Sequence, residues 1–127
     1  MNREIKFRAW NTVLNEFFPN VQNHINDKEY AFGSMLKDTE RFIVQQFTGL
    51  KDKNGTEIYE GDILYFVLHE KILDGFIKKD THYKTAHVIY HSGGFFTHKD
   101  DDLCIGLWID DTVEVVGNIF ETPELLE

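Results

Sequence analysis

The chain has 127 residues, of which 42% are hydrophobic and 14% aromatic, which suffices for one globular core but not for two full domains. Its formal net charge is −9, and its single cysteine excludes an internal disulfide and a four-cysteine zinc site. The sequence shows neither an apolar run long enough for a membrane helix nor a signal-peptide pattern, so we expect a cytoplasmic protein without a membrane partner.

The first 19 residues are predicted to form a β-hairpin. Ile5, Phe7 and Ala9 alternate with Lys6 and Arg8 in a strand pattern, and residues 11–15 contain turn-forming asparagines. Residues 16–18 supply the returning strand, which ends at a proline because proline lacks an amide donor. Residues 20–40 are rich in Asn, Asp and Lys, and we interpret them as a variable surface loop with a short extended segment at residues 30–32.

Residues 41–127 are predicted to form the main β core. Residues 41–47 carry apolar side chains on both faces, which is typical of a central strand. Asp52, Asn54 and Gly55 indicate a tight turn, and Gly61 indicates a bend before a long apolar strand at residues 62–70. We expect Gly55 and Gly61 to adopt backbone conformations that a β-carbon disfavours. A Gly-Asp bend before such a strand also resembles SH3-like barrels.

Further strands follow at regular turn signals. Residues 73–76 predict a turn, and residues 77–85 predict a polar hairpin arm or a loop. Strands are predicted at residues 86–91, 95–98, 103–109 and 113–120, with a turn at residues 92–94, a bulge at Gly117 and a C-terminal helical turn that starts at Thr122. The sequence therefore predicts one all-β domain over residues 1–127, a small barrel or sandwich of about seven to nine mostly antiparallel strands.

The turn residues and the last strand resemble a known family signature. The residues that carry the resemblance are Thr48, Gly49, Leu50, Asp52, Asn54, Gly55, Ile58, Tyr59, Gly61, Asp62, Gly117 and Asn118. This set is similar to the YopX family of phage and prophage proteins, as are residues 3–10 and 123–126, whereas the stretches around 20–41 and 71–84 share no such pattern. The resemblance implies a small, mostly β, phage-encoded protein in a bacterial host, and it brings no catalytic residues. We interpret the signature as architecture.

Four histidines are candidates for a metal site: His82, His87, His91 and His98. His87 and His91 share one face of a predicted strand but lie about 13 Å apart along it, too far for one ion. His91 and His98 flank a turn and form the better-placed pair. Because no cysteine partner or paired-ligand motif accompanies them, we expect partly exposed histidines, with no metal centre and no cofactor.

Carboxylates gather at two places. Asp100, Asp101 and Asp102 are consecutive, and the middle one faces away from its neighbours in an extended chain, so we interpret them as a solvated loop and not an ion site. Glu60 and Asp62 have the alternate spacing that a pair of hydrolytic carboxylates requires. Turns commonly use acids to accept backbone amide hydrogen bonds, which favours a structural role for Asp62 and no catalytic residues.

Three functions remain, in descending order of support. The first is a non-catalytic protein-interaction module that binds a host or phage protein, favoured by the acidic C-terminal part: residues 98–127 carry one Lys and nine acids. The second is a small-barrel nucleic-acid binder that uses Lys78, Lys79 and Lys84, which the overall charge disfavours. The third is a hydrolase that uses Glu60 and Asp62. Apolar residues on both faces of several strands also predict self-association.

Overall fold

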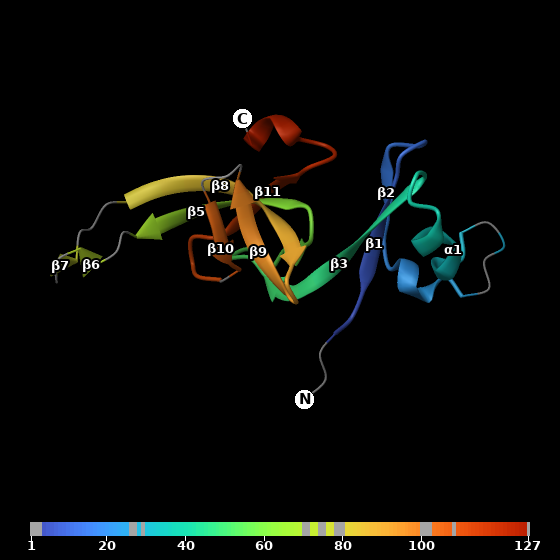
Figure 1. Cartoon of the computed structure of the whole chain (residues 1–127), viewed down its shortest axis with the longest axis horizontal. Helices are drawn as coiled ribbons and strands as arrows, with labels where there is room; N and C mark the ends of the chain where they lie inside the picture. Colours follow the sequence, from blue (N-terminus) through green and yellow to red (C-terminus); the bar gives the residue numbers. More distant parts are fainter. Residues whose placement is uncertain are drawn as a thin grey trace. The chain divides into compact units, whose positions relative to one another are not determined.

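The computed structural model describes residues 4–25, 28, 30–69, 72–73, 76–77, 81–99, 103–107 and 109–126. In these residues, nine strands of three or more residues form a four-stranded and a five-stranded sheet, and two shorter strands form a separate pair (Figure 1). The predicted all-β, mostly antiparallel class is confirmed. The chain divides into two compact units, Met1–Gly49 and Leu50–Glu127. The expectation of a single domain stays a prediction.

The first unit begins with the predicted hairpin, which the structure confirms. The side-chain oxygen of Asn11 accepts hydrogen bonds from the amides of Val13 and Leu14, and Asn15 closes the turn with a φ of 54°. Asparagine suits both positions, because its short side chain can accept hydrogen bonds from nearby backbone amides and because the residue tolerates a positive φ. The strands are β1 (Phe7–Asn11), β2 (Glu16–Phe18) and β3 (Phe42–Lys51), in which β1 lies between the other two.

Residues 20–40 contain two short helices that the sequence did not predict, η1 (Val21–Asn23) and α1 (Phe32–Lys37). Ala31 is extended, as expected for residues 30–32, but Phe32 begins α1. Gly33 and Ser34 are poor helix formers, so local propensity gave no helix signal. Tertiary packing explains the helix, because the buried side chain of Met35 joins a core made with Ala9, Val21 and Phe42.

The second unit is built on a five-stranded sheet in the order β10-β9-β8-β5-β11. One face of this sheet carries the core, in which Leu64, Phe66, Ala86 and Val88 are buried together with Ile58. Its strands are β5 (Asp62–His69), β8 (Thr81–His91), β9 (Gly94–Lys99), β10 (Leu103–Gly106) and β11 (Glu114–Asn118). The short β4 (Glu57–Tyr59) precedes them and neighbours β3 in the four-stranded sheet.

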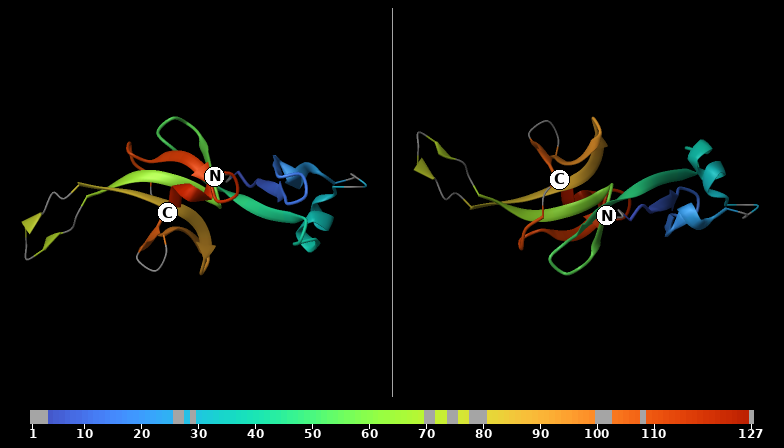
Figure 2. Two further views of the ribbon diagram at one scale, coloured as in Figure 1. Left: turned by 90° about the horizontal axis from the view of Figure 1, so that it is seen from above. Right: turned by 90° about the horizontal axis from the view of Figure 1, so that it is seen from below.

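Strands β5 and β8 extend past their neighbours as a two-stranded ribbon. Their pairing continues to His69 opposite Thr81, whereas the pairing of β11 with β5 stops at Tyr65 and that of β9 with β8 at His87. Figures 1 and 2 show the ribbon in three views. The segment 77–85, predicted as an arm or a loop, therefore enters a strand at Thr81. The small pair β6 (Ile72–Leu73) and β7 (Phe76–Ile77) lies between the two strands in sequence.

Several turns agree with their sequence signals. Ser92 and Gly93 have φ angles of 48° and 81° and close the β8–β9 hairpin, and the register of β11 against β5 shifts between Val115 and Gly117, which is the predicted bulge. Strand β10 ends at Gly106, three residues before the predicted end. The C-terminal turn is present as the 3-10 helix η2 (Pro123–Leu126). In the part of the chain described, no helix is long and apolar enough to cross a membrane.

The conformation of Gly55 generates a first prediction. Gly55 has a φ of 81°, as expected, and open space where a β-carbon would project. Gly55→Ala should therefore destabilise the protein through backbone strain alone, by about 1–2 kcal/mol. Gly33→Ala is the matched control: it also meets open space, but in α1 with no positive φ, and should be neutral or stabilise by up to about 1 kcal/mol. Chemical denaturation measures both, and equal effects would contradict the strain argument.

Candidate functional site

The signature residues converge first on the carboxylate of Asp52, in the turn after β3. Its Oδ1 accepts hydrogen bonds from the amides of Asn54 and Thr56, each at 2.9 Å, and its Oδ2 accepts one from the amide of Val115 at 2.9 Å. The first two bonds fix the turn, and the third joins it to β11, which lies 63 residues later in the chain. One side chain that is 7% exposed thus holds two distant segments together.

The pKa of Asp52 reflects this environment. Burial raises the pKa of the carboxyl, but the amides of Val115, Thr56 and Asn54, together with the charge of Lys53, outweigh burial and lower the pKa below its ordinary value. The carboxylate is therefore the form that the fold selects. The geometry agrees, because three N–H donors point at its two oxygens.

The bend between β4 and β5 is held in the same manner. The buried carboxylate of Asp62 accepts a hydrogen bond from the amide of Tyr59 at 2.7 Å, across Glu60 and Gly61. Gly61 has a φ of 86°, as expected. Its amide donates to the carbonyl of Val88, and its carbonyl accepts from the amide of Ile119, so the main chain of one glycine connects two further segments of the second unit.

The end of β11 forms the third part of this framework. The side-chain oxygen of Asn118 accepts from the amides of Phe120 and Glu121, and its Nδ2 donates to the carboxylate of Glu121 at 2.7 Å. The hydroxyl of Thr122 accepts from the amide of Asn118 and donates to its carbonyl. Asn118 lies opposite Asp62 in the register of β11 and β5. These bonds turn the chain into η2 and keep that turn against the sheet.

The structure thus places most signature residues in one framework of the second unit. Asp52, Asn54 and Gly55 form the turn, Ile58 is completely buried on β4, and Asp62 and Asn118 are buried where β5 and β11 meet. Leu50 is on the last part of β3, whereas Thr48 and Gly49, with a φ of 88°, belong to the first unit. Both carboxylate oxygens of Asp52, Oδ2 of Asp62 and the side-chain amide of Asn118 form hydrogen bonds within the fold itself.

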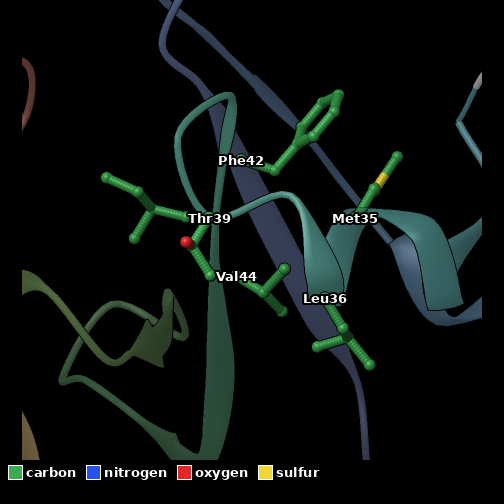
Figure 3. Close-up of a pocket in the computed structure, with 6 residues that line it drawn as sticks. Met35, Leu36, Thr39, Phe42 and Val44 are labelled. Atoms are coloured by element: carbon green, nitrogen blue, oxygen red, sulfur yellow. The ribbon is translucent and has the colours of Figure 1, made fainter.

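An apolar groove lies in the first unit, between α1 and β3 (Figure 3). It has a volume of about 280 Å³ and is lined by Met35, Leu36, Thr39, Phe42, Ile43 and Val44. Leu36 is 51% exposed and Ile43 is 38% exposed, so apolar carbon reaches the surface here. No sequence pattern predicts this groove, because one of its walls is α1, a helix without a clear local signal. In the sequence, the adjacent apolar residues Met35 and Leu36, followed by Phe42, are the feature that points to an apolar surface here.

The predicted histidine pair is wrong. His91 lies opposite Gly94, and the residue opposite His98 is His87, with ring centroids 5.5 Å apart and planes at 81°. His91 instead has its ring centroid 6.1 Å from that of Phe96. His82 is on β8, paired with Leu68. Within the described residues, no three His, Cys, Asp or Glu side chains form a group that could hold a metal ion.

The remaining predicted residues are less informative. Lys84 is on β8 opposite Phe66. Lys78, Lys79, Asp100, Asp101 and Asp102 lie outside the described residues, so the basic and acidic clusters to which they were assigned stay predictions.

With the geometry established, comparisons give the family. The model of the family described as YopX protein matches residues 6–127. The chain belongs to the YopX family. A search of curated proteins finds no match. Among solved structures, this YopX chain is similar to the crystal structure of protein EF1440 from Enterococcus faecalis, with 27% sequence identity and a TM-score of 0.59. The match covers 99% of this chain and 100% of the EF1440 chain.

The Asp52 bonds predict how the stability of this YopX chain depends on pH. The pKa of Asp52 is lower in the folded than in the unfolded state, so its contribution is complete above the unfolded value, near 4, and is lost as pH falls through the lower folded value. Asp52→Asn should cost about 1–3 kcal/mol at neutral pH, because an amide NH₂ then faces a backbone donor. Urea unfolding from pH 3 to pH 7 checks both statements. A variant whose stability falls below pH 4 as steeply as that of the wild type would contradict the assignment to Asp52.

Gly117 allows a sharper test of the third part of the framework. A β-carbon at this position would lie 1.9 Å from the hydroxyl oxygen of Thr122 and 2.9 Å from a methyl carbon of Leu125. Gly117→Ala should therefore displace η2 and cost about 1–3 kcal/mol. Gly106→Ala meets open space and is the matched control. Thermal unfolding that gives the same midpoint for both variants would show that η2 yields without cost.

Proposed function

We propose that this YopX protein is a non-catalytic protein-interaction module that takes up an extended segment of a partner along the edge of β3. The partner is a host or phage protein, and the protein acts in the cytoplasm of a bacterial host that carries the phage or prophage. The observation that carries the proposal is the apolar groove beside this edge, with Leu36 and Ile43 exposed at its rim. The phage origin rests on the family alone.

The edge itself supports the proposal. The amide of Thr12 donates to the carbonyl of Arg41, and the amide of Phe47 donates to the carbonyl of Lys6, both at 2.9 Å. The N–H and C=O groups of successive residues point to opposite sides of a strand. Those of the odd-numbered residues 41–47 therefore point towards β1, and those of Val44 point away from β1. Strand β4 has three residues and follows a tight turn, so it can flank only the last residues of β3. An added strand can therefore pair with the main-chain groups of Val44 on the side of β3 that faces away from β1.

The groove provides the specificity that main-chain pairing lacks. Side chains of an added strand alternate between its two faces, so every second residue of the partner points towards one face of the sheet. An apolar side chain of the partner fits the groove between α1 and β3, where Met35, Phe42 and Val44 form the apolar wall. The proposed ligand is thus an extended peptide with an apolar anchor.

The use of the acidic signature residues also favours binding over hydrolysis. Asp62 is 3% exposed and accepts the amide hydrogen of Tyr59, so it serves the bend that carries it. The alternative in which Glu60 and Asp62 act as a hydrolytic pair requires Asp62 to face a substrate. The nucleic-acid alternative depends on Lys78, Lys79 and Lys84 and on overcoming a net charge of −9.

The groove gives a direct test with a matched control. Leu36→Glu should weaken partner binding by about tenfold or more, because a charge would have to be buried in an apolar contact. Val13→Glu adds the same charge to the same unit at a residue that is 69% exposed in the β1–β2 turn, and should leave binding unchanged. Both substitutions are at exposed residues, so both variants should fold with wild-type stability to within about 0.5 kcal/mol.

The measurement has two stages. A partner is captured from nuclease-treated host lysate with the wild type and identified, and its affinity is then measured for the wild type and both variants. Loss with Leu36→Glu alone supports the groove, and equal affinities for all three proteins contradict it. Saturable binding of oligonucleotides at low salt in gel-shift titration would overturn the proposal in favour of nucleic acid. Light scattering shows whether the partner at the groove is a second copy of the chain, in which case Leu36→Glu should abolish the dimer.

A further inference from the structure

Strands β8 and β9 place two histidines directly opposite each other on the second unit's sheet. His87 and His98 are partners in the register, and both side chains are half-buried. Their ring centroids are 5.5 Å apart and their planes meet at 81°. They lie on the face opposite the core, because core residues Ala86 and Val88 flank His87 in β8 and side chains alternate along a strand. The pair lies in the second unit, whereas the groove lies in the first.

We propose that His87 and His98 form a binding site for a divalent transition metal ion of the zinc and nickel class. Imidazole nitrogen is a preferred ligand of such ions. Two imidazoles bound to one tetrahedral ion at about 2.1 Å have ring centres roughly 5 Å apart. The observed separation is close to this value, so the ion requires rotation of the rings and little movement of the strands.

The surroundings of the pair define the kind of site. The register places Ile63 on the far side of His87, and Ile63 is completely buried, so apolar packing fixes this side of the pair. Among the side chains that the structure describes, no third His, Cys, Asp or Glu joins the pair. In the main-chain register, Cys104 of β10 is the residue opposite His98 on its other side. Water, or a side chain of a bound partner, supplies the other ligands. With these two histidines as its protein ligands, the proposed site differs from a closed four-ligand structural site and should exchange its metal readily.

Metal binding to this pair must compete with protons. Each imidazole binds the ion only in its neutral form, so affinity should fall as the solution is made more acidic. An ion that binds the folded chain alone also stabilises it by linkage, which raises the unfolding temperature as the metal concentration increases. Loss of both responses in variants of either histidine distinguishes a specific pair from general attraction of cations to an acidic protein, because general attraction does not depend on either histidine.

The experiment uses the full chain without a histidine tag. Calorimetric titration with Ni²⁺ or Zn²⁺ at pH 7.5 should give one ion per chain, and His87→Gln and His98→Gln should each weaken binding about tenfold or more. His91→Gln is the matched control: His91 is exposed on the same strand, opposite Gly94. Cu²⁺ electron paramagnetic resonance should show two nitrogen ligands in the wild type and fewer in either variant.

Three outcomes would overturn the proposal. They are affinities that are equal in all four proteins, loss of binding with His91→Gln, and a melting temperature that metal raises equally in the wild type and His98→Gln. Glutamine retains hydrogen-bonding capacity and much of the volume of histidine, which limits the effect on folding. If His87→Gln nevertheless fails to fold, His98→Gln alone decides the matter, since the ion needs both rings.

Discussion

The second unit depends on one buried carboxylate that satisfies three backbone amides. Asp52 accepts from Asn54 and Thr56 within its own turn and from Val115 on β11. Separation of the turn from the strand breaks the bond between Asp52 and Val115, which is stronger than a bond between neutral groups because its acceptor is charged. The amide of Lys53 adds a main-chain bond to Val113 beside it. The turn and the last strand are consequently one cooperative element.

This arrangement explains why a signature rich in acids and glycines need not describe an active site. Asp52, Asp62 and Asn118 each accept hydrogen bonds from main-chain amides. Gly61 and Gly117 occupy positions where a side chain would cause backbone strain or a steric clash. Residues of this kind hold the same fold together irrespective of what it binds. The two proposed binding sites lie elsewhere, at the groove of the first unit and at the cross-strand histidine pair.

The sequence predicts those parts of the fold that local chemistry decides. Asn, Asp and Gly favour the φ values that tight turns require. Residue type alone therefore predicts the hairpin at Asn11, the Gly55 turn and the bulge before Gly117. Residue type does not predict helix α1, because burial of Met35 outweighs the poor helix propensity of Gly33 and Ser34. The groove was missed with it, since its wall is that helix.

The register of the β8–β9 hairpin, and with it the pairing of the histidines, could not be predicted from the sequence. The β8–β9 turn has two residues, Ser92 and Gly93, so His91 faces Gly94 and the partner of His98 is four residues further back, at His87. Turn length sets the register of a whole hairpin, and an error of one residue moves every side chain to the other face. Sequence spacing alone names the right histidines but not which of them meet.

Asp52 and Val115 are 63 positions apart in the sequence, and this separation imposes an order on biosynthesis. Both sides of the β1–β3 ladder lie within residues 6–47, so the ribosome has made every strand of that ladder before it begins β5. The Asp52 turn, by contrast, lacks its third donor until β11 has been synthesised. Until then the carboxylate stays hydrated and β5 lacks its neighbour β11, which leaves the nascent second unit with an unpaired strand edge. Completion of the last strand is thus the event that closes the fold.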